Sequence, residues 1–200
     1  MRLEAKNVSF HYGKEKIIEN VDFSLEQGEI VGLAGPSGCG KTTFCKILAG
    51  YENPHSGTIT INGLSIPKKG YNPVQLIHQH PEKVVNPRWK MSKILSEAGV
   101  PDTELLESLG IKDEWLTRWP NELSGGELQR FCVARALGVN TQFLLADEMT
   151  TMLDAITQAQ IWHAVLEIAK RRNIGVLVVS HERKLVEKLC SRVIQFNTNK

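Results

Sequence analysis

A glycine-rich loop between an expected strand and an expected helix limits the folds open to this chain more than any other feature. Residues 35–43 read Gly-Pro-Ser-Gly-Cys-Gly-Lys-Thr-Thr, which contains the complete pattern GxxxxGK[ST]. A continuous apolar run at 30–34 precedes the loop and helical spacing follows at 44–49. Glycines let backbone amides surround phosphate oxygens, and the helix N-terminus adds partial positive charge. The segment therefore predicts a phosphate-binding loop.

The three side chains at the end of this loop, 41–43, carry charge or hydroxyl groups suited to a nucleotide. Lys41 is expected to reach the β and γ phosphates, the Thr42 hydroxyl to bind Mg²⁺, and Thr43 to lie close to the α phosphate. The remaining contacts are expected from Gly35, Pro36, Ser37, Gly38, Cys39 and Gly40. The alternative is an ordinary glycine-rich turn, but such a turn does not require every fixed position of the pattern between a strand and a helix.

Two adjacent carboxylates follow a second apolar run. Residues 143–146 lead directly to Asp147 and Glu148, so the pair is expected at the end of a buried strand and not at a solvated terminus. Two carboxylates at one strand end can divide their work, since one neutralises a cation while the other accepts or orients a proton. The pair is therefore a candidate for chemistry on the bound phosphate.

The periodicity of apolar residues predicts strands that alternate with helices. Strands are expected at 3–10, 17–25, 57–63, 74–78, 174–179 and 192–196, and helices at 91–98, 103–109, 131–137, 155–171 and 182–190. This order implies an α/β fold with a mostly parallel, twisted sheet and helices on both faces. The first two strands are expected to form an antiparallel pair at the edge of the domain.

The domain plan follows from the same pattern. We expect a single domain over residues 1–200, with a nucleotide-binding core at 1–79 and 121–200. Residues 80–120 change to short helical periods and are expected to form an inserted helical subdomain.

Composition excludes several other classes of protein. The net charge of +2 argues against a general nucleic-acid binder, and the four cysteines show no CxxC spacing that would suggest a zinc site. No apolar run approaches the roughly 18 to 20 residues that a membrane span needs, and the N-terminus lacks an apolar signal core. We therefore expect a chain that does not cross a membrane by itself and whose thiols are reduced in the cytosol.

The run Leu-Ser-Gly-Gly-Glu at 123–127 is a second candidate anion site. Ser124 can cap the helix that follows, and the amides of Gly125 and Gly126 are free to face an anion. Together with the phosphate loop and the strand that ends in Asp-Glu, this run resembles the nucleotide-binding subunit of ABC transporters, a family of P-loop NTPases. The resemblance covers essentially the whole chain, with the motifs in the family's order. It implies ATP and Mg²⁺ as cofactors, and ATP hydrolysis as the reaction.

The resemblance assigns roles to five further positions. Tyr12 matches the aromatic residue that stacks on adenine, although a tyrosine in a hairpin can also have no such role. Gln79 matches the glutamine that joins the metal and the attacking water to the helical subdomain. Asp147 would hold Mg²⁺ through its water shell, Glu148 would be the general base, and His181 matches the switch histidine that contacts the γ phosphate.

The resemblance also explains how the 123–127 run reaches a nucleotide. Ser124, Gly125 and Gly126 cannot easily reach a phosphate held by the 35–43 loop of the same chain. In this family two such domains pair head to tail, and each run closes over the nucleotide of the other. The implied active unit is a dimer with itself or with a related ATPase, with Asp154 at the seam.

Some positions depart from the family pattern. Met149 stands where proline commonly follows the acidic pair, which bears on the stiffness of that turn but not on the carboxylates. Thr151 and Met152 replace residues that are usually smaller, which bears on the dimer seam. His80 stands where an aspartate often follows the glutamine.

A narrower resemblance indicates the kind of transporter. Gln-His-Pro at 79–81 with Val-Asn-Pro-Arg at 85–88, and Arg-Trp-Pro-Asn-Glu-Leu at 118–123, resemble the peptide and nickel importer ATPases. This implies import of peptides or nickel-like metal complexes, with transmembrane permease subunits, a substrate-binding protein and a peripheral position on the inner face of the cell membrane. The alternatives are a soluble ABC-type ATPase that acts as a conformational clamp, and a regulatory nucleotide-binding module.

Overall fold

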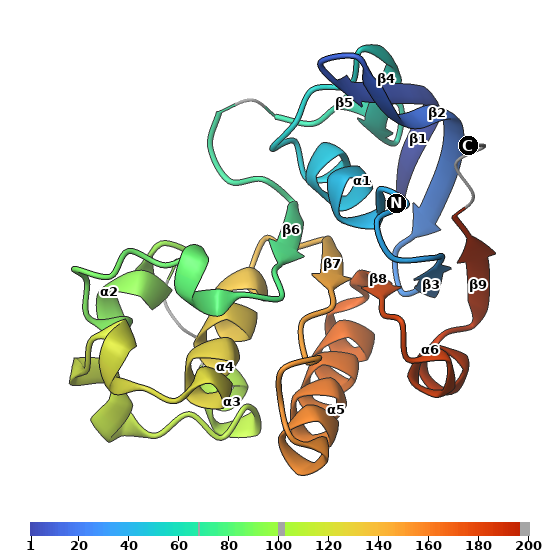
Figure 1. Cartoon of the computed structure of the whole chain (residues 1–200). Coiled ribbons are helices and arrows are strands. Elements are labelled where there is room, and N and C mark those ends of the chain that lie inside the picture. Colours follow the sequence, from blue (N-terminus) through green and yellow to red (C-terminus); the bar gives the residue numbers. More distant parts are fainter. Residues whose placement is uncertain (68, 100–102, 197–200) are drawn as a thin grey trace.

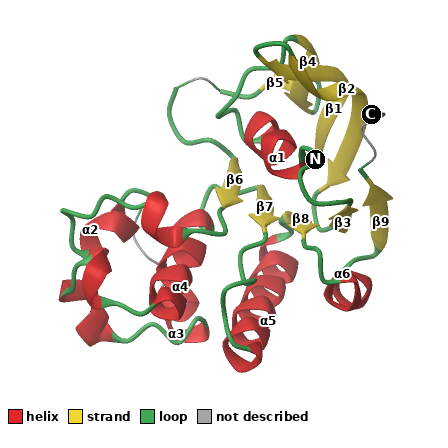
Figure 2. Ribbon diagram, viewed as in Figure 1, coloured by secondary structure: helices red, strands yellow, loops and turns green. Residues whose placement is uncertain are grey.

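Two sheets organise the molecule. The computed structural model describes residues 1–67, 69–99 and 103–196 (Figures 1 and 2). The five-stranded parallel sheet has the order β6 (Val74–Ile77), β7 (Phe143–Asp147), β8 (Gly175–Val179), β3 (Ile30–Ala34) and β9 (Arg192–Gln195). The antiparallel sheet has the order β2 (Glu15–Glu26), β1 (Arg2–Tyr12), β4 (Ser56–Ile61) and β5 (Leu64–Ser65). The predicted α/β class and the antiparallel pair are confirmed.

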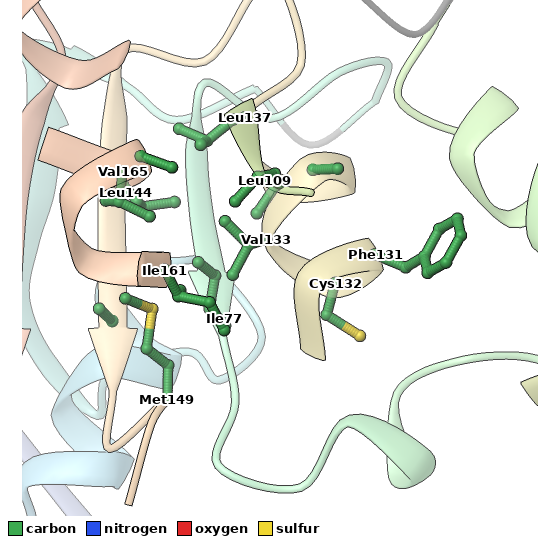
Figure 3. Packing of buried hydrophobic residues seen from close by; sticks show 14 of the residues in the cluster. Ile77, Leu109, Phe131, Cys132, Val133, Leu137, Leu144, Met149, Ile161 and Val165 are labelled. Carbon is green, nitrogen blue, oxygen red and sulfur yellow. The ribbon is translucent and has the colours of Figure 1, made fainter. Parts of the chain in front are cut away.

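The residues of β7 alternate between two cores. Leu145 belongs to a cluster with Phe44 of helix α1 (Lys41–Leu48) and with residues of β1 and β2. Leu144 belongs to a cluster on the opposite face, with Ile161 and Val165 (Figure 3). Because both faces of the strand are buried, its sequence is continuously apolar and does not alternate with polar residues.

Helices cover both faces of the parallel sheet, as predicted. Helix α1 (Lys41–Leu48) lies between the parallel strands and the antiparallel sheet, and α5 (Ala155–Arg172) and α6 (Arg183–Leu189) lie on the other side (Figure 1). Asp154 caps α5 by accepting hydrogen bonds from the backbone N–H groups of Ile156 and Thr157.

Short helices occupy the chain between β6 and β7. They are η1 (Pro81–Lys83), α2 (Met91–Ser96), α3 (Thr103–Ser108), η2 (Asp113–Thr117) and η3 (Pro120–Glu122), followed by α4 (Gly125–Ala136). Figure 2 shows α2, α3 and α4 gathered beside β6. Buried residues of α2, such as Met91, join the same apolar cluster as Leu144 of the central strand. These helices therefore share a continuous core with one face of the sheet.

The start of α4 differs from the prediction. The apolar periodicity indicated a helix over 131–137, whereas α4 begins at Gly125, directly after Ser124, so the predicted capping role of Ser124 is confirmed. Ser124 and Glu127 form a capping box, in which the Ser124 hydroxyl accepts from Glu127 N at 3.3 Å and Glu127 Oε2 accepts from Ser124 N at 2.8 Å. This reciprocal cap satisfies the backbone N–H groups of Ser124 and Glu127, leaves those of Gly125 and Gly126 outside the cap, and offsets the poor helix propensity of the two glycines.

Two further points concern the predicted elements. The strand expected at 57–63 pairs with β1 and so extends the antiparallel pair into a four-stranded sheet. The sequence also predicts a break at Gly99-Val100-Pro101 between the helices at 91–98 and 103–109, and a polar tail at 197–200; the first lies partly and the second wholly outside the described residues. No helix among the described residues is long and apolar enough to cross a bilayer.

Candidate functional site

The phosphate loop begins α1 and lies against the start of β2. Gly40 is the N-cap residue of α1, with φ of 98°, and Gly38 has φ of 75°. A Cβ atom added at Gly40 would lie 2.9 Å from Ile17 Cγ2 and 3.1 Å from the Ile17 carbonyl oxygen. Both the left-handed backbone and the close approach favour glycine here. The loop amides are consequently placed at the N-terminus of α1, where an anion is favoured.

The Lys41 side chain lies inside the phosphate loop and contacts its backbone. Its side chain is 7% exposed, and Nζ donates to the carbonyl oxygens of Gly35 at 2.9 Å and Pro36 at 2.8 Å. A buried ammonium group is unfavourable unless anions or several acceptors surround it. These two carbonyls and Cys39 Sγ at 3.8 Å are neutral acceptors that supply no counter-charge to Lys41, so its position fits an anionic ligand in the loop.

Asp147 lies at the end of β7, beside Thr42 of the phosphate loop. The Asp147 side chain is 4% exposed, and its Oδ1 atom has no hydrogen-bond partner among the described residues. Burial is the main cause that raises the pKa of the Asp147 carboxyl; a hydrogen bond from Thr42 lowers it, and the nearby Glu148 carboxylate raises it. An unpartnered buried carboxylate oxygen next to a hydroxyl is the type of ligand set that Mg²⁺ prefers. The residues present therefore fit that ion.

Glu148 has a strained backbone. Its φ of 50° lies in the left-handed region, which costs a residue with a side chain about 1–2 kcal/mol. Contacts on both sides hold this conformation: Glu148 N donates to Val179 O at 2.9 Å, and the Glu148 carbonyl oxygen accepts from Thr151 N and Oγ1. The next residue, Met149, is 2% exposed (Figure 3), and burying such a side chain is worth about 1.5–3 kcal/mol. Packing of Met149 can thus offset the strain.

His181 comes close to Glu148 from the neighbouring strand. The register of the parallel sheet pairs Asp147 of β7 with Val179 of β8, so both strands end at the same level. Beyond these ends, His181 Nδ1 lies 3.5 Å from Glu148 Oε1. The His181 side chain is mostly exposed and the Glu148 side chain is partly exposed. The two groups can therefore act together on a ligand that lies above the strand ends.

The 123–127 run lines a different part of the surface. Ser124, Gly125 and Gly126 border a cavity of about 670 Å³, together with Gln79 and Asp154. Among the described residues that line this cavity, none belongs to the phosphate loop at 35–43. The structure therefore divides the predicted site residues into two groups, one at the phosphate loop and strand ends and one at this cavity.

Tyr12 lies in the hairpin between β1 and β2. Its side chain is half exposed, and its ring meets Phe10 edge to face with centroids 4.9 Å apart. On the same strand, His11 stacks on His55 with ring centroids 3.5 Å apart. Phe10 thus supports one edge of the Tyr12 ring, and the exposed part of the residue is accessible to a flat ligand.

The positions that depart from the family pattern have distinct environments. Met149 and Met152 both border the cavity, but Met149 is buried in the cluster of Figure 3 and Met152 is exposed. Thr150 is 3% exposed and accepts hydrogen bonds from Gln158 Nε2 at 3.0 Å and Trp162 Nε1 at 3.1 Å. These hydrogen bonds join the turn after Glu148 to helix α5. They hold the turn in place although Met149 stands where the family commonly has a proline.

Sequence reasoning missed Gln129. This residue is 1% exposed and donates from Nε2 to the carbonyl oxygen of His78 at 3.2 Å, next to Gln79. The available signal was a glutamine within the apolar stretch from Leu128 to Val133 that α4 buries. A buried polar residue on such a face needs a partner, but the sequence could not identify which one.

Three comparisons relate the chain to known proteins. The family model described as ABC transporter matches residues 18–151. The nickel import ATP-binding protein NikE of Escherichia coli strain K12 is 33% identical over an alignment of 220 positions that covers 96% of this chain and 82% of the relative. Among solved structures, a protein from Pyrococcus furiosus assigned as an ABC transporter ATP-binding protein has a TM-score of 0.79 and 26% identity, covering 98% of each chain. Another, the ATP-binding subunit of an ABC transporter, has a TM-score of 0.82 and 24% identity, covering 98% of this chain and 85% of that one.

Proposed function

The chain belongs to the ABC transporter family, whose ATP-binding subunits hydrolyse ATP, and from this premise we propose that it drives import across a membrane as the ATPase subunit of a transporter. The observation that carries the import proposal is the identity of 33%, over 96% of the chain, with a nickel import ATP-binding protein. The cargo class proposed is a peptide or a nickel-like metal complex, in line with the sequence motifs at 79–81 and 85–88.

The phosphate loop would hold the triphosphate. Amides of residues 35–43 and the buried ammonium group of Lys41 face the β and γ phosphates, and Thr43 lies close to the α phosphate. Tyr12 would stack on the adenine ring. Mg²⁺ would be held by Thr42 and Asp147, with Gln79 reaching the ion from the border of the cavity, and would neutralise charge on the phosphates. The unpartnered Asp147 Oδ1 atom and the adjacent Thr42 hydroxyl support this assignment.

Glu148 and His181 would carry the proton chemistry. Glu148 accepts or orients the proton of the attacking water, and its constrained backbone aims the carboxylate. His181 donates toward the γ phosphate and can hold Glu148 in place through the 3.5 Å contact. Gln79 would position the water and link it to the helical subdomain, residues 80–120, which we propose moves against the core at 1–79 and 121–200.

A second subunit would complete the site. Ser124, Gly125 and Gly126 border a cavity that contains none of the described phosphate-loop residues, so the two groups meet if two subunits pair head to tail. The capping box leaves the first amides of α4 directed at an incoming phosphate. Met152, which is exposed, and Asp154, which caps α5, would lie at the interface between the two subunits. ATP binding would close this dimer, and hydrolysis would release it.

The membrane part of the transporter would come from other chains. Permease subunits supply the path and place this protein on the inner face of the cell membrane, and a substrate-binding protein delivers the cargo. No nucleic-acid partner is proposed, because the net charge is only +2.

Reconstitution tests this function. Permease subunits that copurify with the chain would be placed in liposomes with it, and uptake of radioactive nickel and of a labelled dipeptide would be measured with ATP. Uptake of either cargo that requires ATP and is lost in the Glu148→Gln variant is the expected result. ATP hydrolysis without any associated permease would contradict transport and would favour a clamp-type ATPase.

A further inference from the structure

One buried glutamine joins two parts of the proposed site that lie far apart in the sequence. Gln129 is on α4, the helix that Ser124 caps, and its side chain is 1% exposed. Its Nε2 atom donates to the carbonyl oxygen of His78 at 3.2 Å. The residue after His78 is Gln79, which is proposed to hold the metal and water. The amide thus connects the capped helix to the Gln79 segment.

The Gln79 segment needs such a contact, because the parallel sheet no longer holds it. Strand β6 ends at Ile77, whose partner on β7 is Ala146. His78 is therefore the first residue beyond the described ladder of β6. The hydrogen bond from Gln129 fixes its carbonyl and with it the direction in which the chain continues to Gln79.

The other half of the Gln129 amide is not satisfied. Its Oε1 atom is buried and has no hydrogen-bond partner among the described residues. A buried acceptor without a partner costs its full desolvation energy. The adjacent residues of α4, Leu128 and Phe131, are buried and apolar, so a methionine of similar length would fill this space without that cost. Packing alone therefore does not account for a glutamine here.

Helix α4 can transmit a displacement from its capped end. Gln129 lies about 7.5 Å along the helix axis from Ser124, at 1.5 Å per residue, within one continuous hydrogen-bonded helix. A shift of the Ser124 loop as it meets a phosphate would move the Gln129 amide by the same rigid-body motion. The movement would reach the His78 carbonyl through the hydrogen bond at 3.2 Å.

We infer that Gln129 is a positioning residue that sets the place of Gln79 according to the position of the Ser124 loop. The half-satisfied amide allows this contact to differ between the open and closed states, because the free Oε1 acceptor favours any state in which it gains a donor. The inference rests on the head-to-tail site proposed above. Gln129 borders the same cavity as Gln79 and Ser124, and in this role it acts through Gln79.

A double-mutant cycle tests this role. Gln129→Met keeps the length of the side chain and removes the hydrogen bond; kcat is expected to fall about ten- to a hundredfold, the scale of a misplaced catalytic group, with KM changed less than about twofold. In the Gln79→Ala background the same substitution is expected to have almost no further effect, since both act on one step. If the double variant lost kcat by the product of the two single-variant factors, the substitutions would act independently and the inference would be overturned. An unchanged kcat in Gln129→Met would overturn it too.

Gln75 provides a matched control. Its Nε2 donates to the carbonyl oxygen of Asn72 at 2.7 Å, so it makes the same type of bond at the opposite end of β6. Gln75→Met is expected to keep kcat within about twofold of the unsubstituted protein, since no proposed site residue depends on that carbonyl. An equal loss of kcat in both variants would show general damage to β6 and would also contradict the positioning role.

Two measurements separate this inference from the proposed function. Thermal unfolding is expected to show Gln129→Met about as stable as the unsubstituted protein, because the loss of the hydrogen bond to the His78 carbonyl is offset by removal of the buried unpaired Oε1 acceptor. If the unsubstituted chain hydrolyses ATP and Gln129→Met hydrolyses it equally well, the positioning role alone fails. If the unsubstituted chain itself neither hydrolyses ATP nor dimerises with it, the proposed function fails first.

Discussion

His181 Nδ1 and Glu148 Oε1 lie 3.5 Å apart, across the ends of two neighbouring parallel strands. The contact is an ion pair when the imidazole is protonated, and it restrains the carboxylate from the side. Glu148 follows directly after β7 with a left-handed backbone, and its side chain contacts His181. Two strand ends in register and one strained residue thus bring together the two groups proposed to handle the proton.

Glu148→Gln is expected to keep ATP binding and to lower kcat about a hundredfold or more, because an amide cannot accept the proton of the attacking water. Since the substitution preserves size, the turn and its hydrogen bonds through the Glu148 backbone should remain. Gel filtration with ATP and Mg²⁺ should show a stable dimer. A strictly monomeric variant under these conditions would exclude the head-to-tail arrangement for this chain.

Ser124→Arg is expected to abolish turnover and leave the nucleotide affinity of the monomer nearly unchanged, because the new side chain blocks only the nucleotide of the partner. Loss of the helix cap alone costs about 1 kcal/mol. Ser124→Ala removes the cap without adding bulk and therefore serves as the control, measured by fluorescence titration with a labelled ATP analogue. A large loss of monomer affinity in Ser124→Arg would argue against a site completed in trans.

Asp147→Asn is expected to raise the free energy of unfolding of the nucleotide-free protein at neutral pH and to abolish Mg²⁺-dependent hydrolysis. Burial raises the pKa of the Asp147 carboxyl above its usual value of 3.8, so the folded chain binds this proton more tightly than the unfolded chain. Below the usual pKa the carboxyl is protonated in both states, so the substitution brings no gain in the free energy of unfolding. The gain grows as the pH rises above the usual pKa toward the raised pKa of the folded state. Urea unfolding at several pH values measures it, and a gain independent of pH would refute this cause.

Tyr12→Ala is expected to weaken ATP binding about two- to tenfold, the scale of one aromatic stacking contact. Binding of inorganic tripolyphosphate should not change, since it has no ring to stack. Tyr12→Phe keeps the ring and its edge contact with Phe10, so it should bind ATP as the unsubstituted protein does. Equal losses for ATP and tripolyphosphate would mean that Tyr12 supports the fold of the hairpin.

The elements that the sequence predicted well are those with a local cause. The strand–loop–helix at 30–48 requires glycines at Gly38 and Gly40 because the backbone there is left-handed. The central strand that ends at Asp147 was predicted because burial on both faces produces a continuous apolar run. The apolar periodicity placed the start of α4 at residue 131, six positions after its observed start at Gly125, because glycine lowers helix propensity and the cap that compensates is a pairwise contact.

By itself, the sequence determined the α/β class, the phosphate loop, the acidic pair and the family, because glycine spacing and runs of apolar residues are local requirements of the backbone. Only the tertiary structure decided which of these groups meet. The register of β7 and β8 brings His181 to Glu148, and the packing of α4 brings Gln129 to the His78 carbonyl. Such contacts join residues far apart in the chain, so their partners depend on the packing of whole elements and not on local periodicity.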